Sequence, residues 1–426
     1  MIYTESVDYI HSLLKFGIRP GLTGMGALLH LLGDPHKDLK YVHVAGTNGK
    51  GSTSTAISNI LTEAGYKVGL YTSPYVTEFL ERVQFCGKPV SKQVFADSVS
   101  KVKCAVEKLQ TEDVTITEFE ALTAAAFLCY KALACDVVVL EVGLGGRLDA
   151  TNVIDTPLVN IITSLSIDHS AILGNTIEEI AFEKCGTIKR GGKVVCSFGQ
   201  PDGAMKVVSR TVEEQANSLV VPDVSDVDVI KSDVFGTSFT YKNNKYFVPM
   251  AGEHQLKNMT CAIECANILK NYFNITDNNI FDGISKTVLP ARVEVISRKP
   301  LVILDGGHNE DGAKAFYNAV SDEFSKHNRV IVVAGMMADK AVEESLAPLL
   351  RKTDFFFAVT PENPRAMSGD ELAEIASAYT TAFSVADVGE AIEIVSRAAD
   401  ENSAIFVVGS LYLAGEVRER LIEQFS

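Results

Sequence analysis

The sequence predicts an α/β protein of two domains, each built around a mostly parallel sheet. Short apolar runs alternate with helical segments along most of the chain, for example at 40–45, 67–71, 136–141, 158–163 and 193–197. Apolar runs of this kind are typical of parallel strands that helices cover on both faces. The length of 426 residues also fits two to three domains of roughly 150 residues each.

The order of these patterns divides the first domain into a main sheet and a smaller part. We expect a helix over 3–16, a strand over 40–45, and a helix over 53–64 directly after a glycine cluster. The segment 219–250 is short, β-rich and interrupted by turn residues. It predicts a hairpin-like β-rich part, followed by a helix over 256–270.

A second domain begins where the strand–helix pattern restarts. From Leu301 onward five apolar runs (LVILDGG, RVIVVAGMM, FFFAVT, FSVADV and AIFVVGS) are separated by helical segments. They form a complete doubly wound, Rossmann-like unit of roughly 130 residues, a normal domain size. We therefore expect domains at 1–295 and 296–426.

Composition excludes several classes of function. The 39 basic and 54 acidic side chains leave a net charge of −15, which argues against a non-specific nucleic-acid binder. The longest uncharged stretches, 20–33 and 402–415, are too short for a membrane span, and no signal peptide is evident. The eight cysteines lack a CxxC pattern and predict reduced thiols. We expect a cytoplasmic protein.

The strongest local signal is the glycine-rich turn from Gly46 to Ser52, which follows a strand and precedes a helix. Glycines let backbone N–H groups converge on phosphate oxygens, and the start of the helix adds positive potential. Lys50 supplies a full positive charge and Ser52 a hydroxyl for a metal. The strict G-x-x-x-x-G-K-[ST] pattern fails, because Gly51 separates Lys50 from Ser52. The alternative is an ordinary turn with a solvated lysine, but the strand–turn–helix context favours a P-loop-type ATPase domain.

The turn Gly46-Thr-Asn-Gly-Lys-Gly-Ser also resembles the ATP loop of the Mur ligase superfamily, and the extra Gly51 resembles folylpolyglutamate synthase/dihydrofolate synthase. Two small departures are Tyr75, where the family often has His, and Gly307, where Ala is commoner. Nine further blocks agree with this family in the same order: Thr72-Ser-Pro-Tyr with Glu81-Arg-Val, Thr117-Glu-Phe-Glu, Glu141-Val-Gly-Leu-Gly-Gly-Arg-Leu-Asp-Ala-Thr-Asn, Asp168-His, Glu183-Lys-Cys-Gly-Thr-Ile-Lys, His254-Gln-Leu-Lys-Asn, Pro290-Ala-Arg-Val-Glu, Asp305-Gly-Gly-His-Asn and Gly409-Ser-Leu-Tyr-Leu-Ala-Gly-Glu-Val.

Glu141 is the candidate metal ligand that the sequence itself indicates. It ends an apolar strand, and the carboxyl edge of a parallel sheet is where ligands bind; a solvated strand end is the alternative. ATP chemistry needs Mg²⁺, which prefers carboxylate and hydroxyl oxygens. The resemblance implies Ser73, Glu141 and His169 as metal ligands, and a carbamylated Lys184 as a further one. Composition alone would leave Lys184 on a solvated helix face, and a lone His beside an Asp is more often structural.

The resemblance also implies the remaining site residues. Asn258 shares a helix face with Gln255, where surface amides are the alternative, and Phe119 would otherwise fill the core. Arg82 and Arg147 are the basic groups expected to attract anionic substrates. The implied ATP-binding residues are Gly46, Thr47, Asn48, Gly49, Lys50, Gly51, Ser52, Asn258, Arg292, Asp305 and His308. The implied catalytic residues are Lys50, Lys184, His169 and Arg292, and the implied folate-binding residues are Arg82, Phe119 and Glu120.

Taken together, the resemblance implies ATP-dependent ligation of L-glutamate to folates, and also to dihydropteroate, through an acyl phosphate. Its small-molecule partners would be ATP, L-glutamate and the folate or dihydropteroate, with Mg²⁺ and a monovalent cation as ions. We expect a monomer that binds neither nucleic acid nor membrane. Two alternatives stay open: a Mur-type amide ligase acting on a cell-wall precursor, disfavoured by Gly51, and a non-catalytic nucleotide-binding module. Glu141, His169 and Lys184 argue against the module, and Leu148 breaks a dinucleotide fingerprint in the turn that starts at Gly143.

Overall fold

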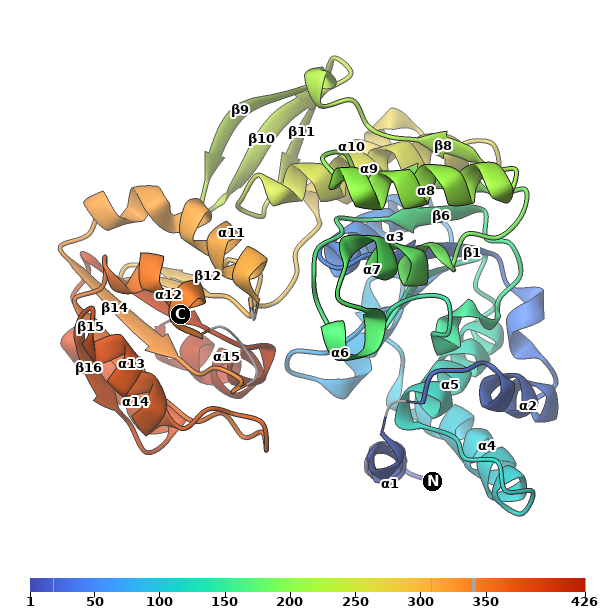
Figure 1. Cartoon of the computed structure of the whole chain (residues 1–426), viewed down its shortest axis with the longest axis horizontal. Helices are drawn as coiled ribbons and strands as arrows, with labels where there is room; N and C mark the ends of the chain where they lie inside the picture. Colours follow the sequence, from blue (N-terminus) through green and yellow to red (C-terminus); the bar gives the residue numbers. More distant parts are fainter. Residues whose placement is uncertain (18, 308, 339–341, 426) are drawn as a thin grey trace.

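Three sheets organise the chain in a computed structural model, which describes residues 1–17, 19–307, 309–338 and 342–425. An eight-stranded and a three-stranded sheet belong to the N-terminal part, and a six-stranded sheet belongs to the C-terminal part. Figure 1 shows the C-terminal part, orange to red, beside the N-terminal part, with the three-stranded sheet extending above both. The predicted α/β class with two mostly parallel sheets is confirmed.

The eight-stranded sheet has the order β4-β3-β2-β5-β1-β6-β7-β8. Its three middle strands, β5, β1 and β6, are buried along their whole length, which explains their mostly apolar sequence. All pairs are parallel except those of β2 with β3 and β3 with β4. The strands are β1 (Tyr41–Ala45), β2 (Val68–Tyr71), β3 (Val83–Phe85), β4 (Lys88–Pro89), β5 (Val137–Glu141), β6 (Val159–Ile162), β7 (Lys193–Cys196) and β8 (Ser218–Val220).

Helices cover both faces of this sheet and create separate apolar cores. One core holds α1, α2, α4 and α5, and another holds α3, α9 and α10. The helix expected over 3–16 is α1 followed by a 3₁₀ turn, Leu13–Phe16. The helices are α1 (Tyr3–Ser12), α2 (Thr23–Leu31), α3 (Lys50–Glu63), α4 (Lys92–Gln110), α5 (Glu118–Ala132), α6 (Ser170–Leu173), α7 (Ile177–Cys185), α8 (Asp202–Glu214), α9 (His254–Leu269) and α10 (Asp277–Ser285).

The β-rich segment forms three antiparallel strands instead of a single hairpin. They are β9 (Val227–Asp233), β10 (Gly236–Tyr241) and β11 (Asn244–Val248), in the order β11-β10-β9. Phe239 and Tyr241 of β10 pack into the same core as α9. The small sheet is therefore attached to the N-terminal domain through the helix that follows it.

The C-terminal sheet has the order β12-β13-β17-β14-β15-β16, parallel except for β12. Apolar cores lie on both of its faces, as in a doubly wound domain. Strand β12 crosses the expected boundary at 295/296 and pairs with β13. The elements are β12 (Glu294–Arg298), β13 (Leu301–Leu304), α11 (Glu310–Val320), β14 (Arg329–Ala334), α12 (Val342–Leu350), β15 (Phe355–Ala358), α13 (Gly369–Ser377), β16 (Thr381–Ser384), α14 (Val388–Ala398), β17 (Ser403–Val408) and α15 (Leu411–Phe425).

Within the described residues, every helix is too short or too polar to cross a lipid bilayer.

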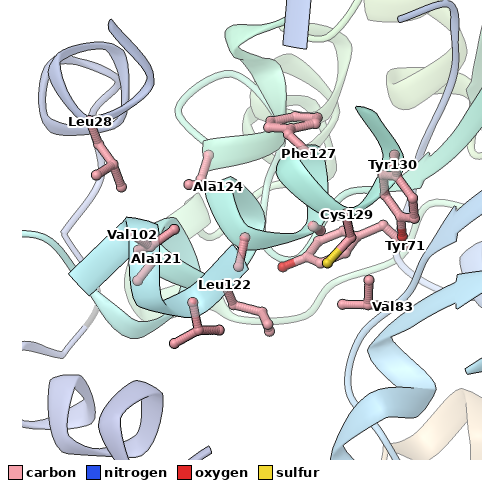
Figure 2. Close-up of a cluster of buried hydrophobic side chains, with 14 of the residues drawn as sticks. Leu28, Tyr71, Val83, Val102, Ala121, Leu122, Ala124, Phe127, Cys129 and Tyr130 are labelled. Atoms are coloured by element: carbon pink, nitrogen blue, oxygen red, sulfur yellow. The ribbon is translucent and has the colours of Figure 1, made fainter. Parts of the chain in front are cut away.

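Helix α5 supplies much of the core beneath the eight-stranded sheet, as Figure 2 shows. Phe127 is fully buried there, against the rings of Tyr41 and His36 at centroid distances of 5.9 Å. Truncation to alanine would leave a cavity. We expect Phe127→Ala to lower the free energy of unfolding by about 3–5 kcal/mol.

Urea unfolding followed by circular dichroism measures this change. The matched control is Phe281→Ala, since Phe281 is 43% exposed and its truncation leaves no cavity. Equal urea midpoints for the two variants would contradict the expected packing role of Phe127.

Candidate active site

A large cavity of about 2040 Å³ lies between the two domains. It is lined by the residues that follow β1, β2, β5 and β6 in the N-terminal domain, and by those that follow β13 and β17 in the C-terminal domain. The carboxyl ends of parallel strands are where open α/β sheets bind ligands. A drug-sized ligand needs roughly 300–1,000 Å³, so this cavity has room for more than one substrate.

The turn between β1 and α3 is pressed against neighbouring side chains. A Cβ atom added at Gly46 would collide with Thr163, and one added at Gly49 would collide with Asn258. Gly49 also has a φ of 88°, in the left-handed region that disfavours larger residues. The N–H of Thr47 donates to Ser164 at 2.8 Å. These contacts explain why this turn needs glycine at both positions.

Lys50 begins α3, three residues before the predicted start of that helix. Its Nζ donates to the carbonyl oxygens of Gly46 at 3.2 Å and Thr47 at 3.1 Å. The ammonium thus lies over the turn, where the N-terminus of α3 already favours negative charge. Ser52, in the first turn of the helix, is buried.

Glu141 ends β5 and faces this turn. Its side chain is buried, and Oε2 accepts a hydrogen bond from the N–H of Ser73 at 3.3 Å. Burial raises the pKa of Glu141 to about 7, although Lys50 and Arg292 oppose this shift. A buried carboxylate beside a serine provides the oxygen ligands that Mg²⁺ prefers. The residues present therefore fit a magnesium ion.

Lys184 is 4% exposed, so α7 does not present it to solvent. Its Nζ donates to the carbonyl oxygen of Gly46 at 2.9 Å. Burial, reinforced by the charge of Lys50, lowers the pKa of Lys184 to about 7. A substantial fraction of the amine is therefore unprotonated at neutral pH, and an unprotonated amine is a nucleophile.

His169 lies on the rim of the cavity, with its side chain 51% exposed and its Nε2 3.9 Å from Asp168. Its backbone has a φ of 52°. Across the described ranges, no three His, Cys, Asp or Glu side chains are grouped closely enough to hold a metal ion. The expected magnesium site therefore depends on Glu141 together with ligands of other residue types, such as Ser73 and a carbamylated Lys184.

The segment that joins the domains carries Arg292 into the cavity, and Asp305 reaches the cavity from the end of β13. Both carboxylate oxygens of Asp305 accept backbone N–H groups, from Val293 at 2.9 Å and from Gly307 at 2.8 Å. Burial raises the pKa of Asp305, and Arg292 opposes the shift. Asp305 thus ties the connecting segment to the end of β13. The expected ATP contact His308 lies outside the described residues.

Asn258 and Gln255 are buried on α9, so they are not surface amides. Nδ2 of Asn258 donates to Oε1 of Gln255 at 2.9 Å, which leaves Oδ1 of Asn258 beside Gly49. The pKa of the neighbouring His254 falls to about 4, because it is buried and close to Arg292. This end of α9 therefore presents a neutral, hydrogen-bonding surface beside the turn.

Arg82 and Phe119 lie together on the cavity wall, with the guanidinium carbon 5.7 Å from the ring centroid. The guanidinium forms an ion pair with Glu118 at 2.7 Å. Glu120 instead caps α5, where its Oε2 accepts from the N–H and hydroxyl of Thr117. Glu118 was not among the residues predicted from the sequence. The T-x-x-E capping box of Thr117 and Glu120 could have distinguished it, because this pattern assigns the capping role to Glu120. Arg147, also on the wall, pairs with Glu183 at 2.8 Å.

Two further contacts could not be found from sequence patterns. Asn309 at the start of α11 donates from Nδ2 to Oδ1 of Asn48 at 3.4 Å, which joins the two domains at the glycine-rich turn. Behind the site, His43 of β1 contacts Thr151, and Thr151 donates to Asp149. Asp149 in turn accepts the N–H of Leu144 in the turn after β5.

Comparisons with known proteins cover nearly the whole chain. Residues 44–266 match the model of the Mur ligase middle domain, and residues 291–411 match that of the Mur ligase, glutamate ligase domain. A dihydrofolate synthase/folylpolyglutamate synthase of Bacillus subtilis is 36% identical over 98% of this chain and 99% of its own. A folylpolyglutamate synthase of Lacticaseibacillus casei is 35% identical, with 99% of each chain covered.

Among solved structures, an FPGS–AMPPCP complex is 34% identical with a TM-score of 0.85, covering 99% of this chain and 100% of its own. Escherichia coli FolC with DHPP and ADP is 28% identical with a TM-score of 0.86, covering 100% and 98%.

The buried His43 predicts a specific loss of stability in acid. Burial holds its pKa near 3, below the ordinary 6.5, so the folded protein keeps His43 neutral while the unfolded chain takes up a proton. The stability from this group is present above pH 6.5 and falls as the pH drops. Between pH 6.5 and 4.5 we expect the loss from His43 to be about 2–3 kcal/mol.

Urea unfolding of the unmodified protein and of His43→Gln across this pH range measures the difference. The control is His30→Gln, because the side chain of His30 is 83% exposed. The expected result is a shallower pH dependence in His43→Gln only. Parallel curves for all three proteins would show that His43 is not held neutral.

Proposed function

Because the chain belongs to the folylpolyglutamate synthase/dihydrofolate synthase family of Mur ligases, we propose that it joins L-glutamate to folates at the expense of ATP. Dihydropteroate is the second acceptor that we propose. The observation that carries this proposal is the cluster of Lys50 with the buried Lys184 and Glu141 at the glycine-rich turn. It lies in a cavity shared by both domains, as a reaction of three substrates requires.

The chemistry explains why ATP is needed. A carboxylate oxygen is a poor leaving group, so direct attack by an amine on a carboxylate does not proceed. Transfer of the γ-phosphoryl group to the folate carboxylate gives an acyl phosphate and ADP. The amine of glutamate then attacks the acyl carbon, and the tetrahedral intermediate releases phosphate as the amide forms. In phosphoryl transfer the protein mainly positions the groups and stabilises charge.

We assign the phosphate end of ATP to the turn from Gly46 to Ser52, with Lys50 as its cation. Asn258 and Asp305, with the expected contact His308, would hold the rest of the nucleotide. Arg292 lies close enough to Glu141 to affect its pKa and would stabilise charge on the transferred group.

Mg²⁺ would be held by Glu141, Ser73 and His169, and it would supply positive charge to the phosphate oxygens. A carbamate on Lys184 would add two oxygen ligands where the free amine now donates to Gly46. The monovalent cation stays an expectation from the family resemblance.

For the acceptor we propose the wall formed by Arg82, Phe119 and Glu120. The ring of Phe119 offers a flat apolar surface for an aromatic acceptor. Arg82 lines the cavity, so its positive charge would attract an anionic group of the acceptor. The two oxygens of Glu120 differ in their surroundings, because Oε1 faces Gly24 while Oε2 caps α5.

We further propose a monomer in the cytoplasm. The structure describes all eight cysteines, and each is a free thiol, which is in keeping with a reducing compartment. The two other functions stay less favoured. The relatives that match along the full length are folate enzymes by name, which speaks against a cell-wall precursor. The buried Glu141 and Lys184 speak against a module that only binds nucleotide.

A coupled assay for ADP release tests this function. With ATP, Mg²⁺ and L-glutamate present, we expect turnover to require a reduced folate or dihydropteroate, and Lys50→Ala to abolish it. The matched control Lys193→Ala, which removes an exposed lysine from β7, should keep full activity. If neither a reduced folate nor dihydropteroate supported turnover, or if Lys50→Ala turned over normally, the result would contradict the proposal. A cell-wall precursor as the only active acceptor would support the alternative ligase.

The modification of Lys184 has its own test. Carbamate formation needs the unprotonated amine, so with a pKa near 7 it should increase as the pH rises through 7. We expect ¹³C-bicarbonate to give a carbamate signal in the carbon NMR spectrum of the unmodified protein and of Lys193→Ala. Lys184→Arg should lack the signal and turn over at least ten times more slowly. A signal that persists in Lys184→Arg would assign the carbamate elsewhere.

A further inference from the structure

The segment after β2, residues 72–78, carries Ser73 and is held together by one carboxylate. The N–H groups of Val76, Thr77 and Glu78 all donate to the side chain of Glu81, at 2.8, 2.9 and 2.7 Å. At the other end of the segment, the N–H of Ser73 reaches Glu141. Because three successive amides share one acceptor, we expect the segment to move as a unit.

The opposite side of this segment rests on the C-terminal domain. Val76 packs against the apolar core that contains Leu413, Ala414 and Val417 of α15. A Cβ atom added at Gly415 would collide with the carbonyl oxygen of Val76. The collision involves backbone, which cannot rotate aside as a side chain can. Glycine at this position therefore allows α15 to approach the segment closely.

Helix α15 is itself fixed to the strand that begins the C-terminal sheet. Arg418 forms a bidentate ion pair with Glu294 of β12, with N···O distances of 2.7, 3.0 and 3.1 Å. Bidentate arginine–carboxylate pairs have a defined geometry. The place of Gly415 is thus set by the C-terminal domain as a whole. The block 409–417 stood out in the sequence and lines part of the cavity, but none of its residues has been given a role in the site so far.

We propose that Gly415 is a positioning residue through which the C-terminal domain sets the place of Ser73. When α15 rests on the carbonyl of Val76, the segment is pressed toward β5 and the N–H of Ser73 meets the carboxylate of Glu141. When the domains separate, this support is removed and Glu141 loses its backbone donor. The effect of this coupling on turnover rests on the proposed function, whereas the coupling itself does not.

Hydrogen exchange measured by mass spectrometry tests the coupling in the full chain. In Gly415→Ala we expect faster exchange in peptides covering 72–82, although the substituted residue belongs to α15. The matched control is Gly26→Ala in α2, where an added Cβ meets no atom within 4 Å and exchange in 72–82 should not change. Faster exchange confined to α15 in Gly415→Ala would overturn the proposal.

Kinetics provide the second measurement. A displacement of Ser73 affects the reacting groups more than the turn that holds ATP, so kcat of Gly415→Ala should fall between about tenfold and a hundredfold. The KM for ATP should change by less than about threefold. A rise in KM with kcat unchanged would overturn the positioning role. If the unmodified chain proves to lack ligase activity, the exchange experiment still decides the coupling.

The unmodified protein gives a test that needs no variant to fold. If α15 supports the segment, amides in 72–82 should not stay protected under conditions in which amides in 411–425 exchange freely. Protection of 72–82 that persists at a urea concentration where 411–425 already exchange freely would overturn the proposal even if Gly415→Ala could not be purified.

Discussion

Two lysine side chains donate to a single backbone carbonyl, with a buried carboxylate facing one of them, and the rest of the site depends on this arrangement. Lys50 and Lys184 both donate to the carbonyl oxygen of Gly46, at 3.2 and 2.9 Å. Glu141 faces Lys50, yet burial still raises its pKa to about 7 and lowers that of Lys184 to about 7. The charged forms of Glu141 and Lys184 are therefore costly without a ligand. A triphosphate would compensate the positive charge of the lysines, and its metal ion would compensate the negative charge of the carboxylate, so the site favours a ligand of that kind.

The fold produces this arrangement by bringing three separate elements to one edge of the sheet. Glu141 ends β5, the turn with Lys50 follows β1, and β1 and β5 are hydrogen-bonded neighbours. Lys184 belongs to α7 and reaches the turn at the carbonyl oxygen of Gly46. The turn packs closely against Thr163 and Asn258, which leave no room for a Cβ atom at Gly46 or Gly49. This close packing restricts movement of the turn. Rigidity at this point is useful for catalysis, since preorganised charges need no rearrangement during the reaction.

Much of this could be predicted from the sequence, where local signals were strong. The strand–turn–helix around Lys50 and the strand ending at Glu141 have clear periodicity, and both were placed correctly. The burial of Lys184 could not be predicted from the sequence of α7, because the sequence of one helix does not show which other elements pack against it. The two roles of Glu118 and Glu120 depend on which one faces Arg82, which is a tertiary contact. The bridge from Asn48 to Asn309 joins residues 261 positions apart, so no local pattern could indicate it.

The site also has a part that depends on how the two domains meet. The cluster at Gly46 lies wholly within the N-terminal domain, whereas Asp305, Asn309 and the support behind Val76 come from the connecting segment or the C-terminal domain. The bridge between Asn48 and Asn309 is long for a hydrogen bond at 3.4 Å, and such a bond contributes only about 1 kcal/mol or less. A contact this weak does not by itself fix the domain arrangement, which a ligand that binds both sides can shift. Substrates that fill the cavity would therefore stabilise the arrangement in which Ser73 and Glu141 meet, and this would link substrate binding to assembly of the phosphate site.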